Sequence, residues 1–419
     1  MDTRRSLDDW LRLQETVHGQ GIDLGLARVR SVAERLDLLP YPLRTIIVAG
    51  TNGKGSTVAC LAALLRAHGH RAGAFTSPHL LRYHERIRVD GAEPSDADLI
   101  AAFEAIDAAR GDTTLTFFEY NALAAMWVFR QRRMDFAVLE VGLGGRLDAV
   151  NIVDAEAAIV CSIGLDHADW LGTDVAQIGR EKAGVFRAGS LAVIADPAMT
   201  PSVAAEAARI GAHALRAGAD YDWQVDETRG SWSFRGSQQF DALERPALAG
   251  ARQYANAAAA IATLSGMGVA LERAGMNHAL RSLQLPGRFQ VVPGPVEWIL
   301  DVAHNEPAAG VLAENLRQRP CAGRTLMVAG ILGDKDIGAI APVLAGAAER
   351  IFLCGIAAPR GLTAAQLAAR APQFAAAVLC DDIAAGMSAA AGEARPGDRI
   401  VVCGSFLAVA PALERLGLY

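Results

Sequence analysis

The sequence lacks the features that would place it in a membrane or on nucleic acid. Its formal charge is −6, and it has no basic run and no basic patch interleaved with aromatic residues, which argues against a nucleic-acid partner. The uncharged stretch 253–271 contains Gln253, Asn256, Ser265 and two glycines, so we expect a core helix with a glycine exit and not a membrane span. The segment Met1–Trp10 is polar and charged, so we expect no signal peptide.

Closely spaced cysteines are also missing. The six cysteines lie far apart, mostly in apolar stretches, and no CxxC pair occurs. They are Cys60, Cys161, Cys321, Cys354, Cys380 and Cys403. This spacing is typical of buried free thiols in a reducing compartment and argues against disulfides or zinc. We therefore expect a cytoplasmic protein.

A chain of 419 residues that is 52% hydrophobic and 21% charged is globular and long enough for two domains. Apolar strands alternate with helical stretches such as Asp96–Ala109 and Glu119–Arg132, which predicts parallel sheets covered by helices. The predicted fold class is α/β, with a P-loop parallel-sheet N-terminal domain over 1–285 and a smaller Rossmann-like doubly wound C-terminal domain over 286–419. The predicted strands are Arg44–Ala49, Arg71–Ser77, Phe136–Gly142, Ala157–Gly164 and Leu191–Asp196 in the first domain, and Val296–Asp301, Thr325–Gly330, Arg350–Gly355, Ala376–Asp381 and Arg399–Ser405 in the second.

Other stretches complete the predicted fold. Residues 1–43 are mostly helical in pattern, with an amphipathic helix that ends near Leu39 before two prolines. The alternation of Trp, Thr, Ser and Gly between Tyr221 and Phe240 predicts an antiparallel hairpin appended to the first sheet. The alanine-rich stretches Thr363–Ala371 and Ala384–Ala391 are predicted helices of the second domain.

One glycine-rich stretch, Gly50–Thr57, has the setting of a phosphate-binding loop. It lies between a β-branched strand and the helical stretch Val58–Arg66. Backbone amides and the positive end of a helix bind phosphate in such a turn, and Lys54 can place its charge on the β- and γ-phosphates. The strict Walker pattern fails, because Gly55 follows the lysine and Val48 replaces the first glycine, so a plain glycine-rich turn is the alternative.

Polar segments follow the other predicted strands of the first domain, at Thr76–His79, Glu140–Asp148 and Gly164–His167. Ligands of open α/β sheets bind beyond the carboxyl ends of the strands, so we expect these segments beside the phosphate loop. Magnesium prefers hard oxygen ligands, which makes Glu140 the best carboxylate for a nucleotide-bound ion. His167 is an unusual magnesium ligand, and from the residues alone a structural histidine is an equally good interpretation.

Further charged groups are more ambiguous. Arg180–Gly184 has the composition of an exposed helix turn with a surface charge network. In the second domain, Asp301 and His304 straddle the predicted start of a helix and can both face a ligand, although an N-capping Asp beside a surface His would give the same pattern. The segment Gly330–Asp336 follows the next strand, and a charged turn is its simplest interpretation.

Three polar residues could contact a nucleotide. Arg288 could reach a phosphate, while Gln253 and Asn256 could hydrogen-bond an adenine or satisfy buried backbone. One domain that binds phosphate and another that supplies Asp301 and His304 describe a nucleotide-dependent enzyme whose cleft closes on its substrates. The residues alone leave the reaction open.

Six motifs occur in the order Gly50–Ser56, Thr76–Leu80, Glu140–Asp148, Gly164–His167, Glu181–Gly184 and Leu300–Asn305. Together they resemble folylpolyglutamate synthase/dihydrofolate synthase, the folate branch of the Mur ligase superfamily, over nearly the whole chain. The resemblance includes the family's own Lys-Gly-Ser form of the phosphate loop. The last motif has Val302, and Glu306 before Pro307, where the family often has glycine and an immediate proline, and this affects only the local loop shape.

The resemblance implies a role for each motif. Lys54 and its loop hold the ATP phosphates, and Lys182 matches a lysine that is carbamylated in the family, a change from cation to anion that would organise a second magnesium ion. The implied magnesium ligands are Ser77, Glu140 and His167. The implied nucleotide contacts are Thr51, Asn52, Gly53, Lys54, Gly55, Ser56, Thr57, Asn256, Arg288 and Asp301, and the implied catalytic residues are Lys54, Lys182, Asp301 and His304.

The resemblance also implies the substrates. The segments 22–29 and Thr116–Glu119 are similar to those that enclose the pterin in bifunctional bacterial members. Phe118 would give the pterin an aromatic face, Asp148 would be its polar anchor, and Thr116 is a further implied substrate-binding residue. We therefore expect an ATP-dependent acid–amino-acid ligase with two magnesium sites. It would join L-glutamate to dihydropteroate and to folate γ-glutamyl chains through an acyl phosphate, and His304 is a candidate acceptor for the amine proton. Small molecules are the expected partners, without nucleic acid or membrane, and we expect a monomer.

Two other functions stay open at this point. A different amide ligase of the superfamily would act on a cell-wall precursor. The short segment before Gly50 argues against this function, because we expect no extra domain there to hold a uridine nucleotide. A non-catalytic nucleotide switch would bind a partner without acceptor-dependent turnover, and no stretch resembles a switch segment.

Overall fold

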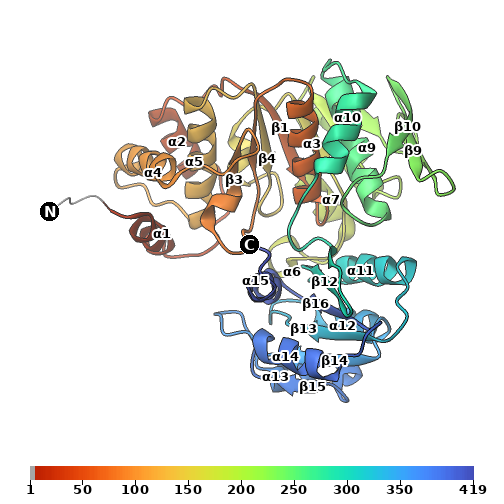
Figure 1. Cartoon of the computed structure of the whole chain (residues 1–419). Helices are drawn as coiled ribbons and strands as arrows, with labels where there is room; N and C mark the ends of the chain where they lie inside the picture. Colours follow the sequence, from red (N-terminus) through yellow and green to blue (C-terminus); the bar gives the residue numbers. More distant parts are fainter. Residues whose placement is uncertain (1–4) are drawn as a thin grey trace. The chain divides into compact units, whose positions relative to one another are not determined.

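The computed structural model describes residues 5–419, which form two compact units (Figure 1). The first unit runs to Ile163 and includes Thr173–Pro246 and Tyr254–Leu283. The second comprises Gly164–Gly172, Ala247–Gln253 and Gln284–Tyr419, so it takes two short segments from earlier in the chain. Of the segment 1–10 considered above, residues 1–4 lie outside the described part.

The first unit is built on a seven-stranded sheet with the order β3-β2-β4-β1-β5-β6-β7, parallel except for β3. Its strands are β1 (Arg44–Ala49), β2 (Ala72–Phe75), β3 (Ile87–Val89), β4 (Phe136–Glu140), β5 (Ala157–Val160), β6 (Leu191–Ile194) and β7 (His213–Arg216). The register places Val48 beside Glu140 and Ala49 beside Val160, so the carboxyl ends of β4, β1 and β5 are neighbours. This parallel arrangement confirms the predicted α/β class and brings the tails of the central strands to one edge.

Helices pack on both faces of this sheet (Figure 1). A core that includes Ile47 and Leu139 of the strands packs against α2, α4 and α5, and buries Val32, Phe103 and Leu123 of these helices. The remaining helices include the adjoining pair α3 and α10. The helices of the unit are α1 (Leu7–Thr16), α2 (Ala27–Arg35), α3 (Lys54–Ala67), α4 (Asp96–Arg110), α5 (Phe117–Gln131), α7 (Val175–Ala183), α8 (Pro201–Ile210), α9 (Ala251–Gly266, mostly in this unit) and α10 (Arg273–Ser282), with the short 3-10 helices η1 (Tyr83–Arg86) and η2 (Ala149–Ile152).

The expected hairpin between Tyr221 and Phe240 is a separate antiparallel sheet, and the prediction that it extends the first sheet was wrong. Its strands are β8 (Asp222–Asp226), β9 (Ser231–Arg235) and β10 (Gln239–Glu244), in the order β10-β9-β8. The third strand pairs with β9 across a bulge between Phe240 and Leu243, which disguises its alternation in the sequence. Trp232 of β9 packs its ring against Tyr254 of α9, at 5.8 Å between centroids, so this sheet has a helix to cover it.

The second unit is a six-stranded sheet with the order β11-β12-β16-β13-β14-β15, parallel except for β11. One face, with Ile299, Met327 and Val401, packs on α11 and α12, while α14 packs on β13 and β14. The strands are β11 (Gln290–Val292), β12 (Glu297–Asp301), β13 (Thr325–Ala329), β14 (Arg350–Cys354), β15 (Val378–Cys380) and β16 (Arg399–Cys403). The helices are α6 (Ala168–Leu171), α11 (Glu306–Gln318), α12 (Ile337–Ala345), α13 (Ala364–Ala368), η3 (Pro372–Phe374), α14 (Ile383–Glu393) and α15 (Phe406–Arg415).

No helix within residues 5–419 is long and apolar enough to cross a membrane. The uncharged stretch that begins at Gln253 forms α9, which ends at Gly266. The expectation of a core helix with a glycine exit is therefore confirmed.

Candidate active site

The stretch Gly50–Thr57 forms a tight turn between β1 and the first turn of α3. Gly50 and Gly53 have φ angles of 149° and 86°, a backbone that favours glycine, and Gly53 precedes the helix without a side-chain cap. The turn is tied to the end of β5, because Thr51 N donates to Ser162 O at 2.8 Å. The first turn of α3 thus presents amides from an uncapped helix end, the geometry that binds phosphate.

The other members of the loop differ in how their side chains are used. The Ser162 hydroxyl accepts from Asn52 N at 3.0 Å and donates to Asn52 O at 2.9 Å, so Asn52 is held by both backbone groups. Thr57 donates its hydroxyl to Gly53 O at 2.9 Å and is fully buried, while Ser56 is also buried and Gly55 lies in the same turn. Thr57 therefore supports the loop through its side chain.

Two lysines converge on one carbonyl of this loop. The Nζ atom of Lys54 donates to Gly50 O at 3.0 Å and to Thr51 O at 3.2 Å. Lys182, at the end of α7, donates to the same Gly50 O at 3.2 Å and is only 5% exposed. The structure therefore brings together two of the residues predicted to be catalytic, and the buried Lys182 lies apart from the ion pairs that its neighbours Arg180 and Glu181 form.

Ser77 and Glu140 also lie side by side. Ser77 N donates to Glu140 Oε2 at 3.2 Å, and Glu140 is 4% exposed at the end of β4. These residues supply a carboxylate and a hydroxyl, which are hard oxygen donors. His167 belongs to the second unit. Within residues 5–419 no three or more His, Cys, Asp and Glu side chains form a group that could hold a metal ion by themselves.

The loop after β4 is locked to the end of α7. Arg146 N donates to Glu181 O at 3.0 Å, and Arg146 Nε donates to the Glu181 carboxylate at 2.9 Å. Gly145 lies so close that a Cβ there would be 2.8 Å from Lys182 O. These contacts hold the backbone on both sides of Lys182 and so position its ammonium at Gly50.

Asp148 closes the same loop from inside. Its Oδ2 accepts from Gly142 N and Leu143 N, both at 2.9 Å, and its Oδ1 accepts from Val150 N at 3.1 Å. Burial raises the pKa of Asp148 to about 7, although the three amides and the charge of Lys54 oppose the rise. Asp148 therefore sits near a protonation equilibrium at neutral pH.

The predicted pterin segments meet at the start of α5. Thr116 caps this helix through a hydrogen bond from Glu119 N, and Arg28 Nη2 contacts the Glu119 carboxylate at 3.2 Å, which joins segment 22–29 to segment 116–119. Phe118 packs against Phe75 with the two rings tilted by 48°, at 5.7 Å between ring centroids, and its ring lies within 2.5 Å of where a Cβ on Gly142 would be. Phe118 therefore lies against the backbone of the loop that contains Asp148.

Asn256, on α9, lies against the phosphate loop. A Cβ on Gly53 would come within 2.9 Å of Asn256 Oδ1, so a larger residue there would require this amide to shift. The buried thiol of Cys161 lies beneath the loop and is hydrogen-bonded to Thr57 at 3.3 Å. Burial raises the pKa of Cys161 to about 11, so the thiol stays neutral.

In the second unit, Asp301 ends β12 and does not cap a helix. Its carboxylate accepts from Phe289 N and Ala303 N, both at 2.8 Å, and α11 is capped by Asn305, which rules out the alternative of an N-capping Asp301. Burial raises the pKa of Asp301, and the charge of Arg288 opposes the rise. The Arg288 guanidinium lies over the Phe406 ring at 5.0 Å from its centroid.

A cluster in the second unit joins residues that sequence reasoning had treated separately. Asp166 and Lys335 form an ion pair of 2.7 Å, with side chains 9% and 8% exposed, so the segment Gly330–Asp336 is more than a charged turn. His304 Nε2 lies 3.6 Å from the same carboxylate. Burial acts against the charged form of Asp166, yet His304, His167 and Lys335 outweigh it and hold its pKa well below the usual range. The signal in the sequence was the place of both segments after parallel strands.

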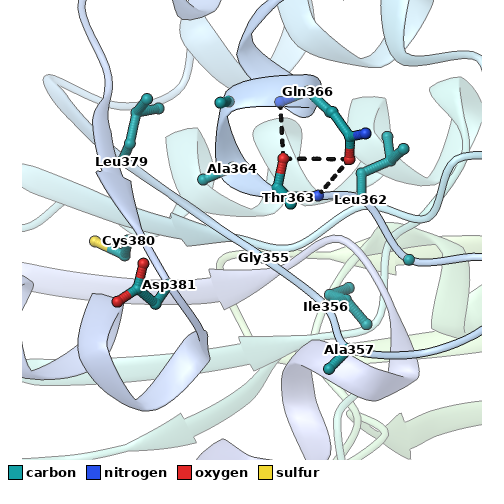
Figure 2. Close-up of a pocket in the computed structure, with 12 residues that line it drawn as sticks. Gly355, Ile356, Ala357, Leu362, Thr363, Ala364, Gln366, Leu379, Cys380 and Asp381 are labelled. Carbon is teal, nitrogen blue, oxygen red and sulfur yellow. Dashed lines mark hydrogen bonds between the residues drawn. The ribbon is translucent and has the colours of Figure 1, made fainter.

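A separate cavity of about 410 Å³ lies at the carboxyl ends of β14 and β15 (Figure 2). Its lining includes Gly355, Leu362 and Asp381, and none of the predicted site residues. The polar atoms of Thr363 and Gln366 bond to each other and cap α13, as Figure 2 shows. We assign no ligand to this cavity.

Comparisons with known proteins agree with this geometry. Residues 48–264 match the model of the Mur ligase middle domain, and residues 287–406 match that of the Mur ligase glutamate ligase domain. The chain is 42% identical over 411 residues to the dihydrofolate synthase/folylpolyglutamate synthase of Escherichia coli K12, covering 97% of this chain and 95% of the relative.

Solved structures are similar over the same length. The structure of E. coli FolC in complex with DHPP and ADP is 41% identical, with a TM-score of 0.93, and the match covers 99% of this chain and 98% of that one. A bifunctional folylpolyglutamate synthase/dihydrofolate synthase with Mn, AMPPNP and L-glutamate bound is 42% identical, with a TM-score of 0.91 and the same coverage.

Proposed function

The chain belongs to the dihydrofolate synthase/folylpolyglutamate synthase family of Mur ligases, and we propose that it joins L-glutamate to dihydropteroate and then to folate γ-glutamyl chains. It is an ATP-dependent ligase of folate metabolism. The observation that carries the proposal is the meeting of Lys54 and Lys182 at Gly50 O. Lys54 brings a positive charge to the phosphate loop, which suits a reaction in which two anions must approach each other.

The residues of the first unit fit a nucleotide and a divalent ion. The uncapped start of α3 and the positive φ of Gly53 leave amides and space for phosphate oxygens, and Asn256 lies at the same loop. Glu140 and Ser77 offer adjacent oxygen donors, which suits a magnesium ion that completes its shell with phosphate and water. We propose His167 as a further ligand of the magnesium ion, because the motif Gly164–His167 resembles that of the family.

Each residue of the site has a defined role in the proposed reaction. When bound, the metal ion would neutralise the charge between the γ-phosphate and the acceptor carboxylate. Lys54 holds the transferred phosphoryl group, while Phe118 and Asp148 orient the acceptor with Thr116 at the helix start. In the second unit, Asp301 and Arg288 hold the nucleotide. When the glutamate amine attacks the acyl phosphate, His304 takes the proton of the amine, the bond between the acyl carbon and the phosphate oxygen breaks, and inorganic phosphate leaves.

Carbamylation of Lys182 and a second metal site are the finer parts of the proposal. Lys182 now donates to Gly50 O as a cation, and a carbamate would replace that donor with an anion. The proposal predicts that intact-mass measurement after incubation with bicarbonate shows one added carboxyl group in the wild type and none in Lys182→Met.

Acceptor comparison tests the function as a whole. The purified protein is given ATP, Mg²⁺ and L-glutamate with dihydropteroate, tetrahydrofolate or a uridine-linked peptide, and release of ADP and phosphate is followed. We expect turnover with dihydropteroate and with tetrahydrofolate. Turnover with the uridine-linked peptide but with neither pteridine acceptor would indicate a cell-wall ligase. Nucleotide binding without turnover on any of the three acceptors would contradict the proposal that the protein is an enzyme. We further propose that the protein is cytoplasmic and that it is a monomer. Sedimentation velocity would check the oligomeric state.

A further inference from the structure

The carboxylate of Asp166 has four partners within the second unit. Its Oδ1 accepts from His167 N at 2.9 Å and from Lys335 Nζ at 2.7 Å. Its Oδ2 accepts from Asn305 Nδ2 at 2.9 Å and lies 3.6 Å from His304 Nε2. One buried carboxylate therefore contacts two histidines that the proposed function places in the reaction.

These partners come from three loops that are distant in sequence. Asp166 and His167 follow β5, Asn305 and His304 follow β12, and Lys335 follows β13, 169 residues after Asp166. All three loops follow the carboxyl ends of parallel strands, where α/β proteins bind their ligands. A contact that joins three such loops fixes the relative positions of the side chains on them, including His167 and His304.

The backbone of His167 depends on this contact. His167 has φ 53° and ψ 43°, in the left-handed region that side chains other than glycine rarely adopt, and its amide is the one that bonds to Asp166 Oδ1. The ring of His304 is held from its other side, by Nδ1 at 2.8 Å from Val302 O. Asp166 therefore acts on the orientation of both histidines, on one through its backbone and on the other through its ring.

The negative charge of Asp166 has its own role. The side chain of Lys335 is only 8% exposed, and an ammonium shielded from water in this way needs an anion within reach. An amide at position 166 would keep the size of the side chain but lose the charge that faces the ammonium, and it would place an NH₂ donor where one carboxylate oxygen now accepts. The cluster would then rearrange around Lys335.

We propose that Asp166 is a positioning residue of the ligase, which fixes His167 as a metal ligand and His304 at the amine through one shared carboxylate. The inference rests on the proposed function. Partners that orient a metal-ligating histidine change metal affinity or activity about 10- to 100-fold when they are removed. An effect of that size separates positioning from simple support of the fold.

The test compares Asp166→Asn with Asp398→Asn in the full chain. Asp398 is also a buried carboxylate of the second unit, paired with Arg324 at 2.9 Å and bonded to two backbone amides, but it has no contact with the loops named above. Three quantities are measured: kcat with dihydropteroate, thermal unfolding, and the affinity of the enzyme–AMPPNP complex for Mn²⁺ by electron paramagnetic resonance. We expect Asp166→Asn to lower kcat and Mn²⁺ affinity by about 10- to 100-fold, whereas Asp398→Asn lowers only the unfolding temperature.

Further variants separate the possible outcomes. If Asp166→Asn is too unstable to purify, Asp166→Asn/Lys335→Met removes both charges, and we expect it to fold and still bind Mn²⁺ weakly. If either Asp166 variant keeps the wild-type Mn²⁺ affinity and kcat, the inference is overturned. His167→Ala tests the premise: wild-type Mn²⁺ affinity in this variant would overturn the metal role of His167 in the proposed function and the inference with it. Weak binding in His167→Ala with normal binding in Asp166→Asn would overturn the inference alone.

Discussion

Lys54 shows how a charged residue can serve the chemistry of a loop more than its stability. Its ammonium bonds to the backbone carbonyls of Gly50 and Thr51, and these contacts are with neighbours three and four residues away. Local bonds of this kind add little to the free energy of unfolding, whereas a lost charge at a transferred phosphoryl group adds directly to the barrier.

Replacing Lys54 by alanine should therefore lower kcat at least about 100-fold and change the free energy of unfolding by less than about 1 kcal/mol. Release of ADP with dihydropteroate as acceptor measures the first quantity, and urea denaturation measures the second. A loss of stability in proportion to the loss of activity would mean that the loop is only structural.

Asp148 should make stability depend on pH around neutrality. Its pKa is raised from 3.8 to about 7 by burial, so between these values the folded protein keeps a proton that the unfolded chain releases. The stability that Asp148 contributes is complete below the lower value and is lost as pH rises toward the higher one, by at most about 1.4 kcal/mol per pH unit.

Asp148→Asn removes this titration, so the stability advantage of the wild type over the variant should shrink from pH 5 to pH 7 and then level off. Urea denaturation of both proteins at intervals of one pH unit measures the difference. A constant difference across this range would show that Asp148 is charged throughout.

At the scale of elements, the packing of α7 on the loop after β4 controls the position of Lys182. Gly184, at the end of α7, has an ordinary helical backbone, but a Cβ there would lie 2.4 Å from the Cβ of Arg146 and 2.9 Å from its Cα. Only glycine allows these two backbones to approach.

Gly184→Ala should destabilise the protein by about 1–3 kcal/mol through overpacking and lower kcat, because Lys182 must move with the end of its helix. The matched control is Gly310→Ala in α11, where a Cβ meets no atom within 4 Å. This control should stabilise the protein by about 0.5–1 kcal/mol and leave kcat unchanged. Equal effects of the two variants in denaturation would contradict the packing argument.

The long central strands were predictable, because their apolar and β-branched residues are buried on both faces. The predicted Arg44–Ala49 is β1 to the residue, and Phe136–Gly142 contains β4. The short strands β3, β7 and β11 escaped prediction, since a segment of three or four residues is too short to show a periodic pattern and is defined by its neighbours. In the third strand of the small sheet, Ala242 has φ 52° within a bulge, which interrupts the expected alternation.

The site was predictable as far as the position of motifs after strands allows. That rule anticipated the closeness of Ser77 to Glu140, and the position of Glu140 beside the end of the strand that leads into the phosphate loop. It could not anticipate that Lys182 reaches a carbonyl 132 residues earlier, or that Lys335 is buried against Asp166. Such pairings depend on side-chain burial, which one sequence does not reveal for charged residues.

For the whole molecule, nucleotide binding should shift the unfolding equilibrium. A ligand that binds only the folded state stabilises it by about 2.7 kcal/mol at 100 times its Kd. We therefore expect AMPPNP with Mg²⁺ to raise the unfolding temperature of the wild type, and removal of the ion with a chelator to reverse most of the increase. Differential scanning calorimetry measures both shifts. Lys54→Ala should show a smaller increase at the same nucleotide concentration, and an equal increase would place the nucleotide elsewhere.

The membership of Gly164–Gly172 in the second unit has a consequence for the nascent chain. Asp166 leaves the ribosome 169 residues before Lys335, which at typical rates of translation is a delay of about 10–30 s. During that time β5 and β6, which flank the segment, can already pair, while Asp166 still lacks the ammonium of Lys335 as its partner. The last third of the protein therefore decides when the middle of the chain acquires its final conformation.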